Sequence, residues 1–326
     1  MKKWLKRIGL ALVVFLIIIS ILPFLIPIAA QEKATQVAPF GESEFVQIDG
    51  VSLHYRQWEP KQAEMKGKIL LIHGLGGSTF SWRNNVDVLL QAGYLVVAVD
   101  LPGFGYSDRA RGINQSQANR SKLLWELLAK VDAALLFKAQ AMQWFLAGHS
   151  MGGGTATAMT IAKPERIKAL ILVDGALFDN NPGFAATLIK FPPVARWAQV
   201  FFQYYALQEK QIASFLSSAY GRAATKEEVQ GYLSPLELPG TNSTMLDLVG
   251  TAASVPVEGL NKTEVPVIGI WGSKDSWVPV EQAVKIQKIV PRMTYSLIDG
   301  AVHCPMETHA AAFNQQLLQD LTKLSR

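Results

Sequence analysis

The segment Gly148-His149-Ser150-Met151-Gly152 constrains the fold of this chain more than any other feature of the sequence. An apolar run at residues 142–147 precedes it, and a helix-compatible run of small residues follows it. A strand, a tight turn and a helix in this order are the context in which G-x-S-x-G forms a nucleophile elbow. The glycines leave room for the strand and the helix that pack against the turn. We therefore predict that Ser150 is a nucleophile at the carboxyl end of a strand.

A serine hydroxyl needs a general base, and the base needs an acidic residue that orients it. With a nucleophile elbow, the expected chain order is serine, then aspartate or glutamate, then histidine. His303 is the only one of the five histidines that lies on a loop after the last predicted strand. Active-site groups of open parallel sheets gather at the carboxyl ends of the strands, so we expect His303 to be the base for Ser150.

Three aspartates compete for the role of the orienting acid. Asp275 follows the predicted strand at residues 265–271, and we favour it. Asp174, at the end of the strand before it in the chain, is the first alternative, and Asp299, shortly before the histidine, is the second. An aspartate that does not serve as the acid is expected to cap the backbone of its own turn.

A second turn supports the same chemistry. The apolar run at residues 68–72 reads as a buried strand, and His73-Gly74-Leu75-Gly76-Gly77 follows it. Acyl transfer needs two backbone N–H groups directed at the developing oxyanion, one from the residue after the nucleophile and one from an early turn of this kind. We predict Met151 and Leu75 for these two positions, and for His73 a packing and hydrogen-bonding role in its turn.

Taken together, these motifs resemble the α/β-hydrolase superfamily from about residue 45 to the C-terminus. The Gly-His-Ser-Met-Gly form is similar to that of carboxylesterases, monoacylglycerol lipases and some carbon–carbon bond hydrolases. A serine at position 150 argues against the dehalogenase and epoxide hydrolase branches, which use an aspartate nucleophile. The resemblance implies a structural role for Asp100, which begins the matching segment Asp100-Leu101-Pro102-Gly103-Phe104-Gly105-Tyr106-Ser107.

The expected fold class is α/β: a mostly parallel eight-stranded sheet with helices on both faces, forming a core from residues 44–177 and 261–326. Asp49-Gly50 between two alternating runs predicts a hairpin. Strands alternate with helical segments after it, which implies parallel pairing. The predicted strands are residues 44–48, 51–56, 68–72, 94–99, 142–147, 168–173, 265–271 and 292–298.

The stretch at residues 178–260 is too long for one crossover between the sixth and seventh strands. It is rich in aromatic residues, interspersed with Pro192-Pro193 and Pro235. We predict a mainly helical lid over the active site, which would shape an apolar pocket and exclude water. The alternative is that these aromatic side chains only pack the insertion against the core.

The N-terminus carries basic residues up to Arg7 and then about 23 uncharged residues, Ile8 to Ala30. This run is long enough to cross a hydrocarbon core of about 30 Å and longer than the apolar part of most secretory signals. We favour an uncleaved signal anchor over residues 1–30, with a cleaved signal peptide as the alternative. The basic flank predicts a catalytic domain on the non-cytoplasmic side, joined through a polar tether at residues 31–43.

The composition and the residue spacing argue against nucleic acid binding, an intrachain disulfide and a metal site. The net charge of +5 is concentrated near the N-terminus, and no basic patch interleaved with aromatic residues suggests nucleic acid binding. The single cysteine, Cys304, excludes an intrachain disulfide. No cluster has the spacing of metal ligands, so we expect no metal and no cofactor. The sequence does not predict the oligomeric state.

The favoured function is that of a membrane-anchored serine hydrolase that cleaves carboxylic esters, with a small-molecule ester, lipid-derived or otherwise apolar, as substrate. Carbon–carbon bond hydrolysis and cofactor-free peroxidase activity on the same fold are the alternatives. A membrane-tethered binding module without catalysis is a third hypothesis, against which the complete set of Ser150, Asp275 and His303 argues.

Overall fold

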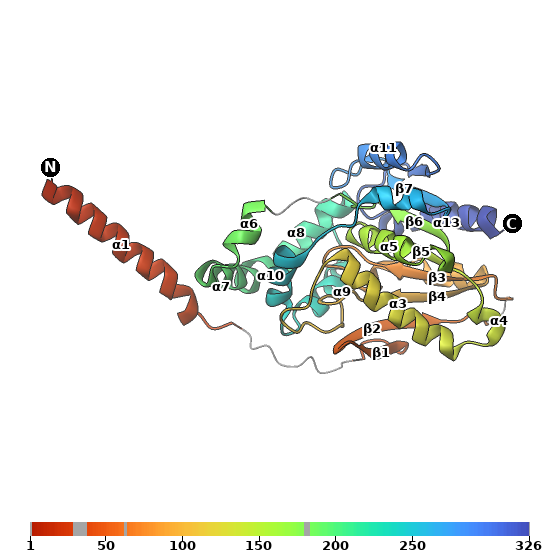
Figure 1. The fold of residues 1–326 in the computed structure, drawn as a ribbon, viewed down its shortest axis with the longest axis horizontal. Coiled ribbons are helices and arrows are strands. Elements are labelled where there is room, and N and C mark those ends of the chain that lie inside the picture. Colours follow the sequence, from red (N-terminus) through yellow and green to blue (C-terminus); the bar gives the residue numbers. More distant parts are fainter. Residues whose placement is uncertain (1, 29–37, 62–63, 179–182, 326) are drawn as a thin grey trace.

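The computed structural model describes residues 2–28, 38–61, 64–178 and 183–325, so most of the predicted tether lies outside the described residues. Eight strands form one sheet in the order β1-β2-β4-β3-β5-β6-β7-β8, and β3 to β8 are mutually parallel (Figure 1). The predicted α/β class and the eight strands are confirmed. The strands are β1 (Ser43–Ile48), β2 (Val51–Trp58), β3 (Gly67–Ile72), β4 (Tyr94–Val99), β5 (Trp144–His149), β6 (Ile167–Val173), β7 (Val267–Gly272) and β8 (Thr294–Ile298).

Helices cover both faces of the sheet because its central strands are apolar on both sides. Along β3, Leu70 and Ile72 belong to one buried cluster with α3, α5 and α11, whereas Ile69 and Leu71 belong to a second cluster with α2 and α13. This alternation follows the two-residue period of a strand. The helices of the core are α2 (Val86–Gln91), α3 (Gln117–Ala134), α4 (Phe137–Gln140), α5 (Met151–Ala162), α11 (Val280–Ile289), α12 (Pro305–Thr308) and α13 (Ala310–Ser325), with 3₁₀ turns η1 (Thr79–Trp82) and η2 (Pro164–Arg166).

Asp100 fixes the loops at the carboxyl ends of β3 and β4 to each other. Its Oδ1 accepts a hydrogen bond from the Thr79 N–H at 2.6 Å, and its Oδ2 accepts one from the Tyr106 N–H at 2.7 Å. Oδ2 also lies 2.7 Å from Nδ1 of the buried His54. The side chain therefore satisfies backbone donors of both loops, which is a structural role.

The chain between β6 and β7 is helical and lies at the end of the molecule nearest α1 (Figure 1). Its helices α8 and α9 pack their apolar sides into the second buried cluster. The segment contains α6 (Gly183–Leu188), α7 (Pro192–Phe201), the π-helical turn η3 (Phe202–Ala206), α8 (Glu209–Tyr220), α9 (Lys226–Leu236), α10 (Thr241–Thr251) and the 3₁₀ turn η4 (Val257–Lys262). We call this segment the insertion.

The N-terminal helix α1 (Lys2–Leu25) projects away from the sheet (Figure 1). Its span Lys3–Leu25 has a mean hydropathy of 3.0 and is almost entirely exposed to solvent. By length and composition it is a helix that could cross a membrane or serve as a signal sequence.

Candidate active site

Ser150 lies on a strained turn between β5 and α5. Its backbone has φ 49° and ψ −119°, a conformation that non-glycine residues rarely adopt. A Cβ on Gly148 would lie 2.4 Å from the Gly152 carbonyl oxygen, and one on Gly152 would lie 2.5 Å from the His73 carbonyl oxygen. A side chain at position 148 would clash with the start of α5, and one at position 152 would clash with the end of β3. The two glycines therefore allow the close packing around the elbow.

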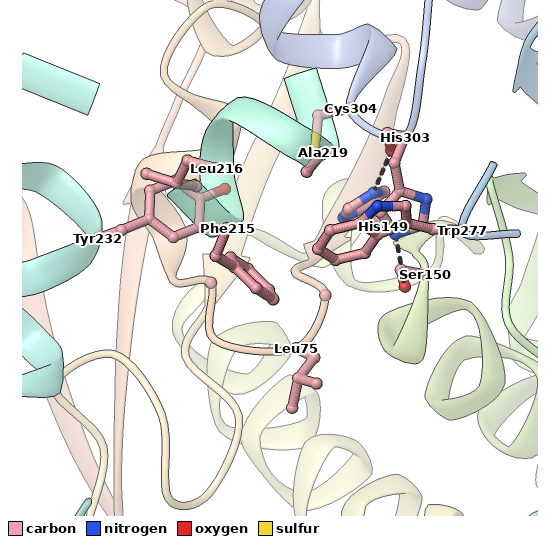
Figure 2. A pocket seen from close by; sticks show the side chains of 12 residues that line it. Leu75, His149, Ser150, Phe215, Leu216, Ala219, Tyr232, Trp277, His303 and Cys304 are labelled. Carbon is pink, nitrogen blue, oxygen red and sulfur yellow. Dashed lines mark hydrogen bonds between the residues drawn. The ribbon is translucent and has the colours of Figure 1, made fainter. Parts of the chain in front are cut away.

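The structure brings Ser150, His303 and Asp275 together in one hydrogen-bonded chain. His303 Nε2 lies 3.0 Å from Ser150 Oγ (Figure 2), and His303 Nδ1 lies 2.8 Å from Asp275 Oδ2. Asp275 Oδ1 accepts hydrogen bonds from the N–H groups of Trp277 and Val278 at 2.8 and 3.0 Å. Burial would raise the pKa of Asp275, but its hydrogen bond and ion pair with His303 outweigh burial and lower it.

Three contacts that the sequence did not predict hold His303 in place. Its N–H donates to the Ala219 carbonyl of α8 at 3.0 Å, and its carbonyl lies 2.7 Å from His149 Nε2. The Trp277 ring stacks on the imidazole with centroids 5.3 Å apart. Burial lowers the pKa of His149 to about 3, so His149 is neutral at neutral pH and donates through Nε2. The sequence pointed to these contacts only through position: His149 lies inside the elbow, and Trp277 lies two residues after Asp275.

The two alternative acids take different places. Asp299 is exposed on the loop after β8 and makes no hydrogen bond to His303 in the described part of the chain. Asp174 is fully buried, and its Oδ1 accepts a hydrogen bond from the Gly272 N–H at 2.9 Å. Burial, together with the negative charge of Asp275, raises the pKa of Asp174 well above its usual range. Asp275 is therefore the carboxylate that contacts the histidine.

Asp174, Asp275 and His303 are also the one set of side chains, among the residues described, whose ligand atoms could converge on a cation, since they lie within 4.8 Å of one another. Two ionised carboxylates at that separation would repel each other by about 3 kcal/mol at an effective dielectric constant of about 20. The facing atoms of Asp275 and His303 already share a hydrogen bond. The arrangement fits proton sharing better than metal binding.

The two predicted oxyanion donors flank Ser150. Met151 is the first residue of α5, so its N–H has no acceptor within the helix. Leu75 lies on the turn after β3 and lines the cavity that contains Ser150. Among the backbone hydrogen bonds of the described residues outside helices and strands, none uses the Leu75 N–H as a donor.

One cavity opens onto the serine, and a second cavity adjoins the first. The first, of about 90 Å³, contains Ser150 and His303, and the second, of about 400 Å³, extends from it beneath the insertion. Leu75, Phe215 and Tyr232, which Figure 2 labels in the lining of the first cavity, also line the second. Within the described residues, neither lining contains a lysine, arginine, aspartate or glutamate. The path away from the serine is therefore apolar.

A buried carboxylate attaches the insertion to the core beside these cavities. Glu307 accepts hydrogen bonds from the hydroxyl groups of Tyr220 and Tyr232 at 2.7 and 2.6 Å and pairs with Arg83. The Tyr232 hydroxyl also lies 2.9 Å from Ser81 Oγ. This network fixes Tyr232 in the cavity wall.

The sequence profile of the α/β hydrolase fold matches residues 68–310. The chain belongs to the α/β-hydrolase fold family. It is a hydrolase of this fold, and several of the curated relatives that it matches share one enzyme name. One is a 2-hydroxy-6-oxononadienedioate/2-hydroxy-6-oxononatrienedioate hydrolase of Paraburkholderia phymatum, 28% identical over 266 residues, which cover 78% of this chain and 87% of the relative.

Two solved structures illustrate the range of similar folds. A membrane phospholipase A, described as a bacterial virulence factor, is 20% identical, with a TM-score of 0.65 and 99% of each chain covered. The serine hydrolase CarC of carbazole degradation is 21% identical, with a TM-score of 0.65, and the match covers 86% of this chain and 98% of CarC. At these identities the similarity shows the fold alone.

Proposed function

We propose that this protein is a serine hydrolase that cleaves carboxylic esters of apolar acyl groups, anchored to a membrane by α1. The observation that carries the proposal is the hydrogen-bonded chain Ser150–His303–Asp275 at the end of an apolar cavity. An activated serine supplies the nucleophile, and the cavity supplies room for an acyl chain.

In this mechanism His303 Nε2 removes the proton from Ser150 Oγ, and the oxygen attacks the ester carbonyl. The N–H groups of Leu75 and Met151 stabilise the oxyanion. Asp275 holds the imidazole in the required tautomer and stabilises the imidazolium. His303 then protonates the leaving alcohol, and a water molecule, activated by the same histidine, releases the acid from the serine.

The apolar lining of the cavities favours an ester over the dicarboxylate that appears in the name of the relative from Paraburkholderia phymatum. A nonadienedioate carries two carboxylates, and a buried carboxylate needs a cation or several hydrogen-bond donors. Neither cavity lining has a lysine or arginine in the described part of the chain. The apolar walls suit a fatty acyl chain instead.

Two observations support a membrane-derived substrate. The first two turns of α1 carry the basic residues Lys2, Lys3, Lys6 and Arg7, which favours a hydrolase domain on the non-cytoplasmic side. The match to the membrane phospholipase A covers 99% of both chains, so it includes the region of α1. We place glycerol esters of fatty acids, including phospholipids, first among the substrates.

The test is a panel of p-nitrophenyl esters from acetate to palmitate, a monoacylglycerol, a phospholipid and a vinylogous diketo acid. Turnover of long acyl esters should be lost in Ser150→Ala and kept in Ser296→Ala, a half-buried serine of the edge strand β8 that lines neither cavity. A fluorophosphonate probe should label the wild type and not Ser150→Ala. Turnover of the diketo acid alone would refute the ester proposal in favour of carbon–carbon hydrolysis.

A further inference from the structure

The exposed apolar side chains of the globular part are concentrated at one place. Outside α1, eleven large hydrophobic side chains are exposed among the described residues, and six of them lie between Phe184 and Tyr205. They are Phe184, Leu188, Phe191, Phe201, Tyr204 and Tyr205. These residues belong to α6, α7, η3 and the loop between α6 and α7, at the end of the insertion nearest α1 (Figure 1).

Specific hydrogen bonds join the last turn of α1 to this surface. Proline has no N–H, so Pro23 leaves the Ile19 carbonyl, four residues earlier, without its helical donor. The Trp197 indole N–H donates to this carbonyl at 2.8 Å. Pro27 likewise frees the Pro23 carbonyl, and Arg196 Nε donates to it at 3.0 Å.

Two more bonds extend the same contact. Arg196 Nη2 donates to the Ile26 carbonyl at 2.7 Å, and the Tyr204 hydroxyl donates to the Pro27 carbonyl at 2.6 Å. The end of α1 and the residues after it are therefore bound to α7 and η3 through main-chain carbonyls, one of which, that of Ile19, is free because of Pro23.

We propose that α6, α7 and η3 form a surface that lies in the headgroup region of the bilayer, held there by α1. The proposal rests on the proposed membrane anchoring. Residues 183–208 contain Lys190 and Arg196 but no aspartate or glutamate, which suits anionic phospholipids. Exposed tyrosine side chains, here Tyr204 and Tyr205, are typical of the membrane–water interface. Phe202, Tyr205 and Ala206 also line the second cavity, so a fatty acyl chain would reach Ser150 from the lipid side.

The test uses the full chain with Phe184→Cys or Phe191→Cys and a nitroxide on the new cysteine, in vesicles of phosphatidylglycerol and phosphatidylethanolamine. The native Cys304 is buried and should not react. Leu136→Cys is the matched control, because Leu136 is 86% exposed and lies near α4, far from α1 (Figure 1). Labels at 184 and 191 should be accessible to oxygen and shielded from a water-soluble nickel chelate, with the reverse at 136.

Equal chelate accessibility at all three positions would overturn the proposal. Broadening between labels that disappears on dilution with unlabelled protein would assign the surface to a second copy of the chain and would also overturn it. Because this readout needs no turnover, it remains decisive if the proposed reaction fails.

The double variant Phe184→Glu/Phe191→Glu should lose at least about tenfold in vesicle phospholipid hydrolysis while p-nitrophenyl butyrate turnover stays within about twofold.

A second inference comes from Asp174, behind the hydrogen-bonded chain of the site. Its Oδ1 is occupied by the Gly272 N–H, but its buried Oδ2 has no hydrogen-bond donor within the described residues. Asp275 and His303 lie beside it and Cys304 is coupled to it electrostatically, so these described partners include no lysine or arginine. A carboxyl oxygen in such a place is satisfied if it carries a proton and donates it.

We infer that Asp174 is held as a neutral carboxylic acid whose O–H donates to the Asp275 carboxylate, so that Asp174 is a positioning residue for the proposed acid. The backbone of Asp174 has φ 45°, a left-handed conformation that aspartate and asparagine tolerate better than most residues. Burial and the charge of Asp275 both raise the pKa of Asp174, in agreement with the neutral form. The donated hydrogen bond spreads the charge of Asp275 and weakens its hold on the His303 imidazolium.

Asp174→Asn tests this inference because the amide reproduces a neutral acid: its oxygen accepts from Gly272 and its NH₂ donates to Asp275. The variant should keep kcat/KM within about threefold of the wild type, with the acid limb of the pH profile unmoved. Asp174→Ala removes the donor, and we expect a loss of about tenfold and an acid limb shifted to higher pH, since the imidazolium is then better stabilised.

An Asp174→Asn variant as impaired as Asp174→Ala would show that the ionised form is required and would overturn the inference. Unchanged pH profiles in both variants would reduce Asp174 to a structural residue and would overturn it too. The infrared band of a protonated carboxylic acid at neutral pH should be present in the wild type and absent in Asp174→Asn. This measurement does not depend on any substrate, so it separates the inference from the proposed reaction.

Discussion

Asp275→Asn is the substitution whose effect follows most directly from the geometry. Asp275 Oδ1 is held by the N–H groups of Trp277 and Val278 at 2.8 and 3.0 Å. In the asparagine variant these donors retain the amide oxygen, because an NH₂ group cannot accept their hydrogen bonds. The NH₂ group must then face His303 Nδ1, where the carboxylate Oδ2 now lies 2.8 Å away.

An NH₂ donor at this position inverts the tautomer of His303. Its Nδ1 becomes the acceptor, and the ring proton moves to Nε2, which faces Ser150 Oγ at 3.0 Å. In this form the base cannot accept the serine proton. We expect kcat to fall by about 10⁴-fold, as the loss of a correctly oriented triad histidine implies, or about 5 kcal/mol of transition-state stabilisation. KM should change little.

The assay is initial-rate hydrolysis of p-nitrophenyl butyrate, with thermal unfolding as the check that the variant is folded. Asp299→Asn is the matched control, since Asp299 is exposed and lies on the neighbouring loop, and it should retain full activity. A loss of less than about tenfold in Asp275→Asn, or a large loss in Asp299→Asn, would refute the assignment of Asp275 as the acid.

Three further predictions follow from the elbow, the cavity and the insertion. Gly148→Ala should abolish soluble, active protein, because the new methyl group would lie 2.4 Å from the Gly152 carbonyl oxygen. Expression and fluorophosphonate labelling measure this effect. A folded variant that the probe still labels would contradict the prediction. Ala206→Trp, which fills part of the second cavity, should reduce palmitate ester turnover at least about tenfold relative to butyrate in the p-nitrophenyl series. The hydrogen bond from Arg222 lowers the pKa of Glu228 to about 2, so its stabilisation is present above about pH 4.5 and is lost as the pH falls towards 2. Urea unfolding at pH 3 and pH 7 should show a smaller acid-induced loss in Glu228→Gln than in the wild type.

The sheet could be predicted from the sequence because central parallel strands are buried on both faces and appear as short apolar runs. Their ends were less certain. The strand predicted at residues 142–147 is β5 at Trp144–His149, since the polar His149 continues the ladder with Val173. Polarity alone therefore marks the end of a strand poorly where a buried histidine has a hydrogen-bond partner.

The order of serine, acid and histidine along the chain could be predicted from the sequence, whereas the aspartate that contacts the histidine could not be decided from it. Asp174 and Asp275 follow the adjacent strands β6 and β7, so either loop could deliver a carboxylate to His303. The difference is a matter of a few ångströms, which no local pattern records. The aromatic side chains of the insertion were predicted as a group, but their division between cavity wall, such as Tyr232, and exposed surface, such as Phe184, depends on how the helices pack.

The need of each buried or helical polar group for a hydrogen-bond partner explains what could be predicted from the sequence and what could not. Pro23 in α1 and Pro27 just after it imply that the carbonyls of Ile19 and Pro23 lack helical donors, and any buried carboxyl group implies a partner for each oxygen. The sequence thus specifies which groups need a partner, whereas only the folded chain supplies it. Here Trp197 and Arg196 satisfy the two carbonyls from about 170 residues away. Substitution of these two residues should therefore leave the sheet intact and loosen the contact of α1 with the insertion.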